Sequence, residues 1–360
     1  MNPKFSKQPT LDYSRSKVNK AGRILADYDS DNPNITVRQL IANYYIMANW
    51  REIHYYPINT FQATLRKKLI TIDKKAIVAQ RLKRIPSIVG ILRNNKTMQL
   101  ARMQDIGGIR AIVMSAAKVK TLEENYRKTQ FTHKLHSSKN YILQPKNTGY
   151  RGIHLVYKYH SPRNPSCEGL FIELQFRSLL QHYWATAVET IGTYLEIPLK
   201  SSIGPKKWLE FFAIIGSAIA HIEGCPPVPE FSNLSKMETF KRTIHESNNL
   251  DVPKIIAAFS MVSTQIKSGQ TKGSYHLIKL DLEEQAVYVK SYPKNQYSLA
   301  NKEYADLERD IQGNPKRQIV LVSTKSINDL QSAYPNFYMD ASGFVFVLNK
   351  IEELIKKLDK

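Results

Sequence analysis

The order of apolar and polar residues along the chain predicts a mixture of helices and strands. Apolar residues recur at three- and four-residue spacing and predict helices at 36–72, 76–98 and 179–195, whereas the first 30 residues are expected to be irregular. Alternating or short continuous apolar runs predict strands at 108–114, 141–145, 152–159 and 170–176. This succession predicts an α+β fold in which a mixed β-sheet is flanked by helices.

The pattern changes in the second half of the chain. Residues 201–205 have the composition of a linker, and helices are expected at 206–222 and 252–268. Beyond Gly273 we predict a hairpin at 274–292, a helix at 299–311, a strand at 317–323 and either a helix or a strand continuing into a helix at 344–358. These elements predict a domain at 1–200 with its core at 70–195, a helical connector at 201–272, and a small C-terminal α/β appendage at 273–360.

Composition argues against a membrane protein or a disulfide-stabilised one. The chain has 360 residues, 42% of them hydrophobic, which is enough for a packed core and allows about two domains. No apolar run approaches the roughly 20 residues that a membrane span needs, and the first ten residues lack the apolar stretch of a signal peptide. Cys167 and Cys225 lack metal-binding spacing and are expected to be reduced thiols. We therefore expect a cytoplasmic protein with no membrane partner.

Positive charge is concentrated at the front of the chain. The net charge is +21, and residues 1–120 carry 22 Lys and Arg against 7 Asp and Glu, or +15, whereas residues 201–360 carry 20 against 18, or +2. Such an asymmetry favours a polyanionic partner such as RNA, although a basic face can also serve solubility alone.

Three polar segments and the carboxylate of Asp105 contain the candidate functional residues. The first segment, RLKRIPSI at 81–88, places Arg81, Lys83 and Arg84 close together, with Arg93 and the hydroxyl of Ser87 nearby. Arginine forks and lysine ammonium groups bind phosphate oxygens, and their mutual repulsion is offset when an anion is bound. A solvated basic face is the alternative interpretation.

Two carboxylates follow in separate elements. Asp105 precedes a Gly-Gly segment that leads to Arg110, and Glu173 lies within FIELQFR. Strand alternation places Glu173, Gln175 and Arg177 on one face. Two carboxylates can hold Mg²⁺ between phosphate oxygens, or one can accept a proton from an attacking hydroxyl. The alternative is a structural salt bridge from Glu173 to Arg110 or Arg177.

The segment PKNTGYRGIH at 145–154 combines a ring with hydrogen-bonding groups. Tyr150, Gly152 and His154 alternate to one side of a predicted strand, so the tyrosine could stack on a nucleobase while His154 and Lys146 meet a phosphate or ribose. Ordinary packing of the Tyr-His pair is the alternative. In the following helix Trp184 is expected to lie in the core.

These segments, in this order, resemble the RelA/SpoT nucleotide pyrophosphokinase domain over roughly residues 70–195. The resemblance rests on RLKRIPSI, QDIGGIR, PKNTGYRGIH, IELQFR and QHYW. It implies transfer of the β,γ-pyrophosphate of ATP to a ribose 3′-hydroxyl. It also implies roles for individual residues: ATP binding by Arg81, Lys83, Ser87 and Arg110, Mg²⁺ binding and catalysis by Asp105 and Glu173, and acceptor binding by Lys146, Tyr150, His154 and Gln175, with Tyr150 stacked on the acceptor base.

The chain departs from the family pattern at Thr148, at Gly152 and at Ile91, where a lysine often stands. Arg93 is a candidate replacement for that missing cation. In this family the acceptor is GDP or GTP in alarmone synthetases and the 3′ CCA end of tRNA in toxic small members. The basic front segment favours tRNA and inhibition of translation. An RNA-binding module that has lost catalysis is a further alternative.

The C-terminal appendage is similar to the antitoxin-like region of fused toxin-antitoxin proteins of the CapRel type. The similarity rests on residues 329–344, where Tyr334 and Phe337 stand in place of a YxxY pair. It implies autoinhibition, with aromatic rings in the adenine slot until a phage protein binds the appendage and triggers release. A Tyr-Pro-Asn turn that merely fills the core is the alternative.

Overall fold

A nine-stranded sheet organises the computed structural model, which describes residues 10–28, 35–128, 131–256, 266–268, 274–281, 283–284, 286–311, 314, 316–323, 332–334 and 341–359. The strands follow the order β3-β4-β5-β2-β1-β9-β7-β8-β6. Their bounds are β1 Ile77–Leu82, β2 Gly107–Val113, β3 Lys134–Asn140, β4 Ile153–Lys158, β5 Phe171–Ser178, β6 Ile266–Ser268, β7 Tyr275–Asp281, β8 Ala286–Tyr292 and β9 Arg317–Ser323. The β2–β5 and β6–β8 pairs are parallel and the others antiparallel, so the predicted mixed sheet is confirmed.

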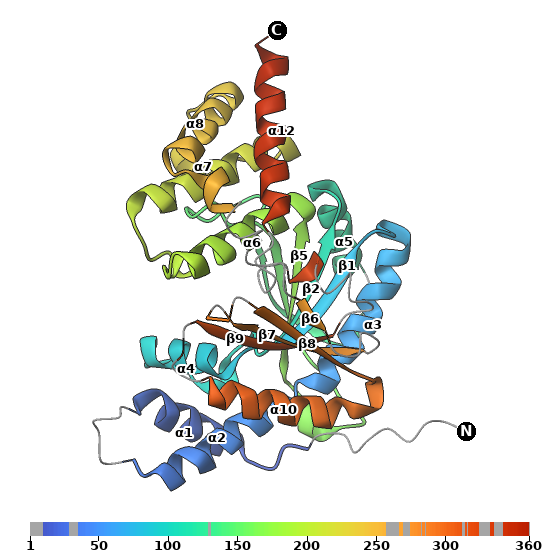
Figure 1. Cartoon of the computed structure of the whole chain (residues 1–360). Coiled ribbons are helices and arrows are strands. Elements are labelled where there is room, and N and C mark those ends of the chain that lie inside the picture. The colour runs from blue at the N-terminus through green and yellow to red at the C-terminus, as the bar shows by residue number, and fades with distance from the viewer. Residues whose placement is uncertain are drawn as a thin grey trace.

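Helices cover both faces of the sheet (Figure 1). The longer ones within the described residues are α1 Arg15–Asp27, α2 Val37–Glu52, α3 Tyr55–Ile72, α4 Ile85–Asn94, α5 Ala116–Lys128, α6 Leu179–Tyr194, α7 Lys206–Glu223, α8 Lys236–Asn249, α10 Tyr297–Asp310 and α12 Ser342–Leu358. None of them is long and apolar enough to cross a membrane.

Strand alternation separates an apolar face from a functional one. In β5 the side chains of Ile172, Leu174 and Phe176 are fully buried in the core that also includes α3 and α5. The opposite face carries Glu173, Gln175 and Arg177, as predicted, and α6 packs over this side together with α7 and α12. Trp184 of α6 is a core residue, 5% exposed.

The strands of the C-terminal appendage continue the sheet of the N-terminal part. β9 pairs with β1 through Gln80↔Ser323 and Arg81↔Val322, and β7 and β8 extend the sheet beyond it. α10 packs on β7 and β9 and lies beside the N-terminal helices, whereas α12 packs against α6 and α8 at the other end of the molecule (Figure 1). The division of the chain at residues 200 and 272 stays a prediction.

Two predictions near the front of the chain are wrong. Residues 77–82 form a strand rather than part of a helix, because they pair along their whole length with β2. The helix begins only at Ile85, next to Pro86, so Arg81, Lys83 and Arg84 do not share its turns. Within the first 30 residues, α1 is a regular helix whose N-terminus is capped by the Ser14 side chain.

Two further predictions fail at strand ends. Residues 141–145 are not a strand, because the side chain of Asn140 accepts hydrogen bonds from the amides of Ile142 and Leu143 and turns the chain after β3. The helix predicted to reach residue 268 does not do so, since 266–268 form β6. The all-helical alternative is confirmed for 344–358 by α12.

Candidate functional site

The candidate site lies on the face of the sheet where β1, β2, β5 and β4 stand side by side. Arg81 pairs with Gly108, and Gly108 pairs in turn with Glu173, so a glycine separates the arginine from the carboxylate in register. Among the described residues, a β-carbon added to Gly108 would meet only one atom within 4 Å, the Arg81 carbonyl oxygen at 3.9 Å. The sheet therefore leaves space between a cation and a carboxylate.

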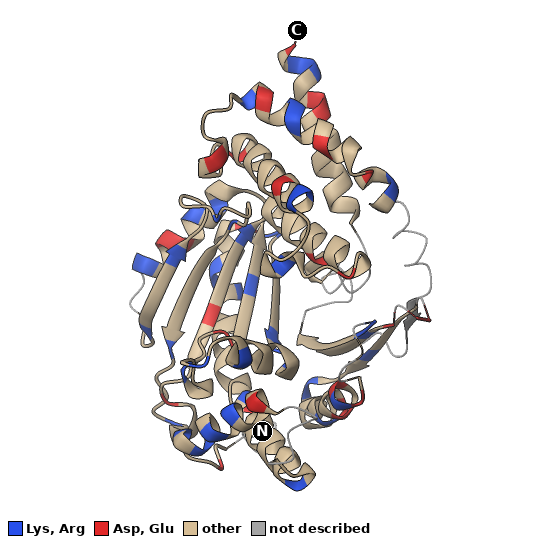
Figure 2. Ribbon diagram, turned by 90° about the vertical axis from the view of Figure 1, so that its left-hand side faces the viewer, with Lys and Arg blue, Asp and Glu red and all other residues tan. Residues whose placement is uncertain are grey.

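Three arginines gather on this face. Arg81, Arg110 and Arg177 come from β1, β2 and β5, and Arg177 Nε is buried without a hydrogen-bond partner among the described residues. Figure 2 shows basic residues on several neighbouring strands of the sheet. Burial lowers the pKa of Arg110 to about 10, and the charges of Arg177 and Arg81 act in the same direction. Crowded, incompletely satisfied guanidinium groups are typical of a site that binds an anion.

Glu189 of α6 is the counter-charge that the structure provides. Burial alone would raise the pKa of Glu189, but the charges of Lys200, Arg81 and Arg110 lower it to about 2. Lys200 Nζ lies 3.1 Å from its Oε2. Sequence reasoning gave no role to Glu189 or to His182 of the same helix.

Asp105 and Glu173 share a common neighbour, Lys83. The Lys83 ammonium lies 2.5 Å from Asp105 Oδ2. Burial raises the pKa of Glu173, but hydrogen bonds from His154 and Gln175, with the charge of Lys83, lower it below its ordinary value. Glu173 is therefore ionised at neutral pH. The salt bridge from Glu173 to Arg110 or Arg177 does not form among the described residues, because its partners are His154 and Gln175.

Glu173 is one member of a closed ring of hydrogen-bonded side chains. An ionised carboxylate only accepts, so His154 donates from Nδ1 to Glu173 at 2.7 Å, and in the neutral form of His154 its Nε2 accepts from the Tyr150 hydroxyl at 2.6 Å. Arg177 donates to the Tyr150 oxygen at 2.9 Å and to Gln175 Oε1 at 3.3 Å, and Gln175 donates to Glu173 at 2.7 Å. The two hydrogen-bonded branches that begin at Arg177 both end at Glu173, which fixes the orientation of this carboxylate.

Residues 141–152 join β3 to β4, and we call them the acceptor-side loop because they include Lys146 and Tyr150, which are predicted to bind the acceptor. This loop brings Lys146 to Tyr150. The Lys146 ammonium lies 5.3 Å from the Tyr150 ring centroid and 4.9 Å from that of Tyr141, and the Arg177 guanidinium lies 5.1 Å from the Tyr150 ring. All the predicted acceptor-side residues except the exposed Lys146 belong to the hydrogen-bonded ring. Arg177 also belongs to it, and strand alternation could have indicated this role.

Two glycines of this loop are required by the backbone. Gly149 has φ +89°, and a β-carbon there would lie 2.5 Å from the Phe212 carbonyl oxygen of α7. On α7 itself, a β-carbon at Gly216 would lie 2.7 Å from the Gly149 carbonyl oxygen. Gly152 has φ +148°, and a β-carbon there would lie 3.2 Å from the Phe176 carbonyl oxygen.

Arg93 does not replace a cation at the site. Its guanidinium donates to the carbonyl oxygens of Ala26 and Tyr28, which ties the end of α4 to the end of α1. Ser87 lies in the first turn of α4 and is partly exposed. Phe337 lies outside the described residues, whereas Tyr334 is 3% exposed and its ring centroid lies 5.8 Å from the Arg110 guanidinium.

The candidate site is thus a cationic sheet face beside a hydrogen-bonded carboxylate, and most of it lies in a segment that is similar to known proteins. Residues 80–196 match the family model described as "Region found in RelA / SpoT proteins", which confirms the resemblance to RelA/SpoT over those residues. The chain is 29% identical over 118 residues to the GTP pyrophosphokinase YjbM of Bacillus subtilis, a match that covers 32% of this chain and about half, 55%, of that relative.

Solved structures of small alarmone synthetases are also similar. Small alarmone synthetase 2 of Bacillus subtilis is 20% identical, with 48% of this chain and 91% of that chain covered and a TM-score of 0.42. Small alarmone synthetase 1 of the same organism, bound to its product pppGpp, is 22% identical, with 47% and 90% covered and a TM-score of 0.39. Both TM-scores are low, so neither structure bears on the activity of this chain.

Proposed function

We propose that this protein is an ATP-dependent pyrophosphokinase of RelA/SpoT type, which transfers the β,γ-pyrophosphate of ATP to a ribose hydroxyl. The observation that carries the proposal is the sheet surface at Gly108 of β2, with Arg81 of β1 on one side, the hydrogen-bonded Glu173 of β5 on the other, and Arg110 two residues along β2. Transfer of a phosphoryl group depends mainly on positioning and charge neutralisation, which such a surface supplies.

The residues present fit a magnesium ion. Mg²⁺ is usually held by one or two carboxylates together with substrate phosphates, so Asp105 and Glu173 beside Lys83 are a sufficient protein contribution. The described residues hold no group of three or more His, Cys, Asp or Glu that could bind a metal without substrate. When bound, the ion would neutralise charge on the phosphate oxygens.

The hydrogen-bonded ring gives Glu173 a role toward the acceptor. Its carboxylate is held by His154 and Gln175 in one orientation and is available to take the proton of the attacking hydroxyl. Tyr150, whose ring is flanked by Lys146 and Arg177, is proposed to stack on the acceptor base.

We propose a guanine nucleotide as the acceptor, because the curated relative is named a GTP pyrophosphokinase. The 3′ end of tRNA is the second candidate, favoured by the charge of +15 over residues 1–120, which a nucleotide alone does not need. Incubation of the full chain with γ-labelled ATP, GDP, GTP and total tRNA, followed by separation of products by size, distinguishes the two. If the Tyr334→Ala variant of the full chain also labels no acceptor, although ATP with Mg²⁺ raises its melting temperature, a silent binding module is the better description.

The C-terminal segment is proposed to restrain this activity. The Ala333 carbonyl oxygen accepts from Arg110 at 3.3 Å, the Ser332 carbonyl oxygen accepts from His182 Nε2 at 2.8 Å, and Tyr334 lies against Arg110. A segment in this position occupies the surface where ATP would contact Arg110. Release of the segment by a phage protein stays a prediction.

A further inference from the structure

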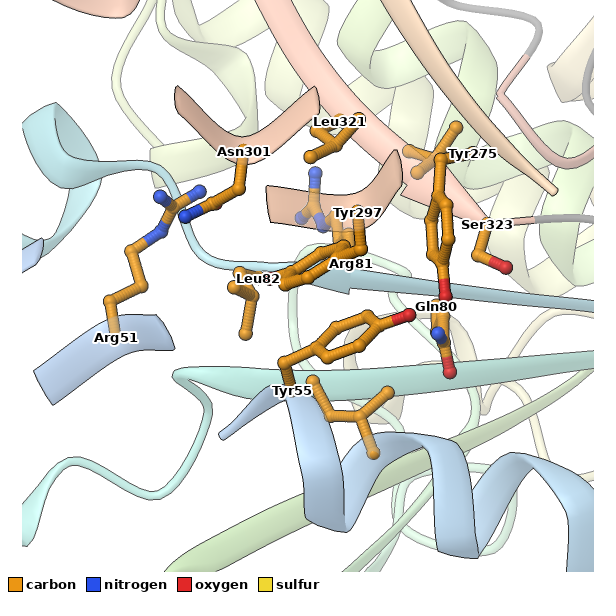
Figure 3. Close-up of a pocket in the computed structure, with 12 residues that line it drawn as sticks. Arg51, Tyr55, Gln80, Arg81, Leu82, Tyr275, Tyr297, Asn301, Leu321 and Ser323 are labelled. Atoms are coloured by element: carbon orange, nitrogen blue, oxygen red, sulfur yellow. The ribbon is translucent and has the colours of Figure 1, made fainter. Parts of the chain in front are cut away.

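The beginning of α4 is held by the C-terminal appendage. α10 lies beside the ends of α2 and α3, and a small pocket at this contact is lined by Arg51, Tyr55, Tyr297 and Asn301, among others (Figure 3). The rings of Tyr55 and Tyr297 stack with centroids 3.5 Å apart and planes 10° apart. This contact joins residues more than 200 positions apart and borders the segment that carries Arg81 and Lys83.

Glu308 of α10 supplies the N-terminal cap of α4. Its Oε1 accepts the backbone N–H of Ile85 at 3.0 Å and the Tyr304 hydroxyl at 2.5 Å, and the residue is 3% exposed. α4 has no cap of its own, because Arg84 makes no side-chain cap hydrogen bond and no acidic residue lies in the first turn. A carboxylate placed there satisfies a free amide and complements the positive end of the helix dipole.

The neighbouring peptide groups are also fixed. Arg51 Nε donates to the Lys83 carbonyl oxygen at 2.6 Å, and its guanidinium lies 4.6 Å from the Tyr304 ring centroid. Burial lowers the pKa of Arg51, but interactions with the Tyr304 hydroxyl and the Glu308 carboxyl raise it above its ordinary value, so Arg51 stays charged. On the other side, β9 pairs with Arg81 of β1. The segment from Arg81 to Ile85 is therefore held at both ends by the C-terminal appendage.

We propose that Glu308 is a positioning residue for ATP, an inference that rests on the proposed pyrophosphokinase function. By taking the Ile85 amide, it fixes the direction in which α4 begins and thus the places of Lys83 and Ser87. Pro86 has no N–H, so the Ser87 amide and hydroxyl are the first-turn donors left for a phosphate. Small errors in such a placement weaken phosphate binding strongly.

The C-terminal appendage would then have two opposite effects on the activity. Tyr334 covers Arg110 and restrains the enzyme, whereas Glu308 supports the segment that binds phosphate. Activation therefore requires residues 332–334 to move while α10 stays in place.

The test uses full-length variants in a Tyr334→Ala background. Glu308→Ala removes the acceptor of the Ile85 amide, whereas Glu308→Gln keeps an oxygen that can accept it. Glu303→Gln is the matched control, because this carboxylate on the same helix accepts only from Lys290 and Tyr292 of β8 in the described structure. Steady-state kinetics give kcat and separate KM values for ATP and the acceptor, and hydrogen exchange reports the amides of residues 83–88.

The proposal expects KM for ATP to rise about tenfold in Glu308→Ala, the ratio that corresponds to about 1.4 kcal/mol, with an unchanged KM for the acceptor and faster exchange at residues 83–88. Glu308→Gln is expected to restore most of the affinity. A purely structural role would lower kcat through the folded fraction and leave both KM values alone, and that outcome overturns the proposal.

Measuring the affinity for ATP without turnover tests the role of Glu308 separately from the proposed function. If the Tyr334→Ala parent transfers no pyrophosphate, the pyrophosphokinase proposal fails. Calorimetric titration with a non-hydrolysable ATP analogue then makes the same comparison without turnover. Equal dissociation constants for Glu308→Ala and Glu303→Gln would overturn the positioning role.

Discussion

Replacing Glu173 by glutamine tests the carboxylate that the whole site surrounds. The carboxylate accepts from His154 through Oε1 and from Gln175 through Oε2, each at 2.7 Å. Glutamine has one carbonyl oxygen, so one of these donors loses its acceptor. An unsatisfied buried donor costs about 1–3 kcal/mol, compared with a total stability of about 5–15 kcal/mol for a folded domain. The Glu173→Gln variant is therefore expected to fold.

Its activity is expected to fall far more than its stability. Loss of a positioned general base lowers rates by about 10²- to 10⁴-fold. The hydrogen-bonded ring contains no other carboxylate that could take the proton of the acceptor hydroxyl in place of Glu173. Transfer of label from γ-labelled ATP measures the rate, and denaturant unfolding measures the free energy of unfolding. Glu123→Gln is the matched control, since Glu123 accepts from Arg127 and Asn140 behind the sheet and its loss should affect stability alone.

The pH dependence of the unfolding free energy provides a second test of the Glu173 carboxyl. The pKa of Glu173 is lowered from an ordinary value of 4.5 in the folded state, so its stabilising contribution is present above that value and disappears as the pH falls through the lowered pKa. The difference in unfolding free energy between the wild type and Glu173→Gln should therefore narrow in acid. Label transfer by Glu173→Gln at the wild-type rate would refute the reasoning.

Three further substitutions test neighbouring features. Tyr150→Ala should abolish transfer, whereas Tyr150→Phe should keep acceptor binding but lower kcat, because His154 loses a hydrogen bond; equal kinetics for Tyr150→Phe and the wild type would contradict this role. Tyr334→Ala should raise basal label transfer by uncovering Arg110, and unchanged activity would leave Tyr334 as packing. Gly152→Ala should cost about 1–3 kcal/mol in denaturant unfolding, because its positive φ is unfavourable for alanine; an unchanged midpoint would refute this.

Local sequence patterns predicted those parts of the site that a single strand determines. Alternation in β5 placed Glu173, Gln175 and Arg177 on one face because side chains on a strand must alternate. The same reasoning failed for 77–82, where pairing with β2 determines a strand although the apolar spacing favours a helix. It failed again at 141–145, where one asparagine side chain ends a strand that begins earlier.

Contacts between distant segments could not be predicted from the sequence. Glu308 caps an amide 223 positions away, and no pattern within α10 distinguishes it from the other, less buried acidic residues of the same helix. Likewise, the apparent surplus of cations at 81–93 included Arg93, whose guanidinium is used to hold α1. Such pairings depend on how helices pack, which local periodicity does not encode.

The direct backbone contact between Gly149 and Gly216 has a consequence for how the acceptor-side loop is controlled. Because neither position has a side chain, the backbone of the loop before Tyr150 packs directly on the backbone of α7. Even a methyl group at residue 216 would clash with the loop and push it away from the helix. Any tilt of α7, which also carries α8, would therefore be transmitted to Tyr150 through main-chain atoms rather than absorbed by side-chain rotation.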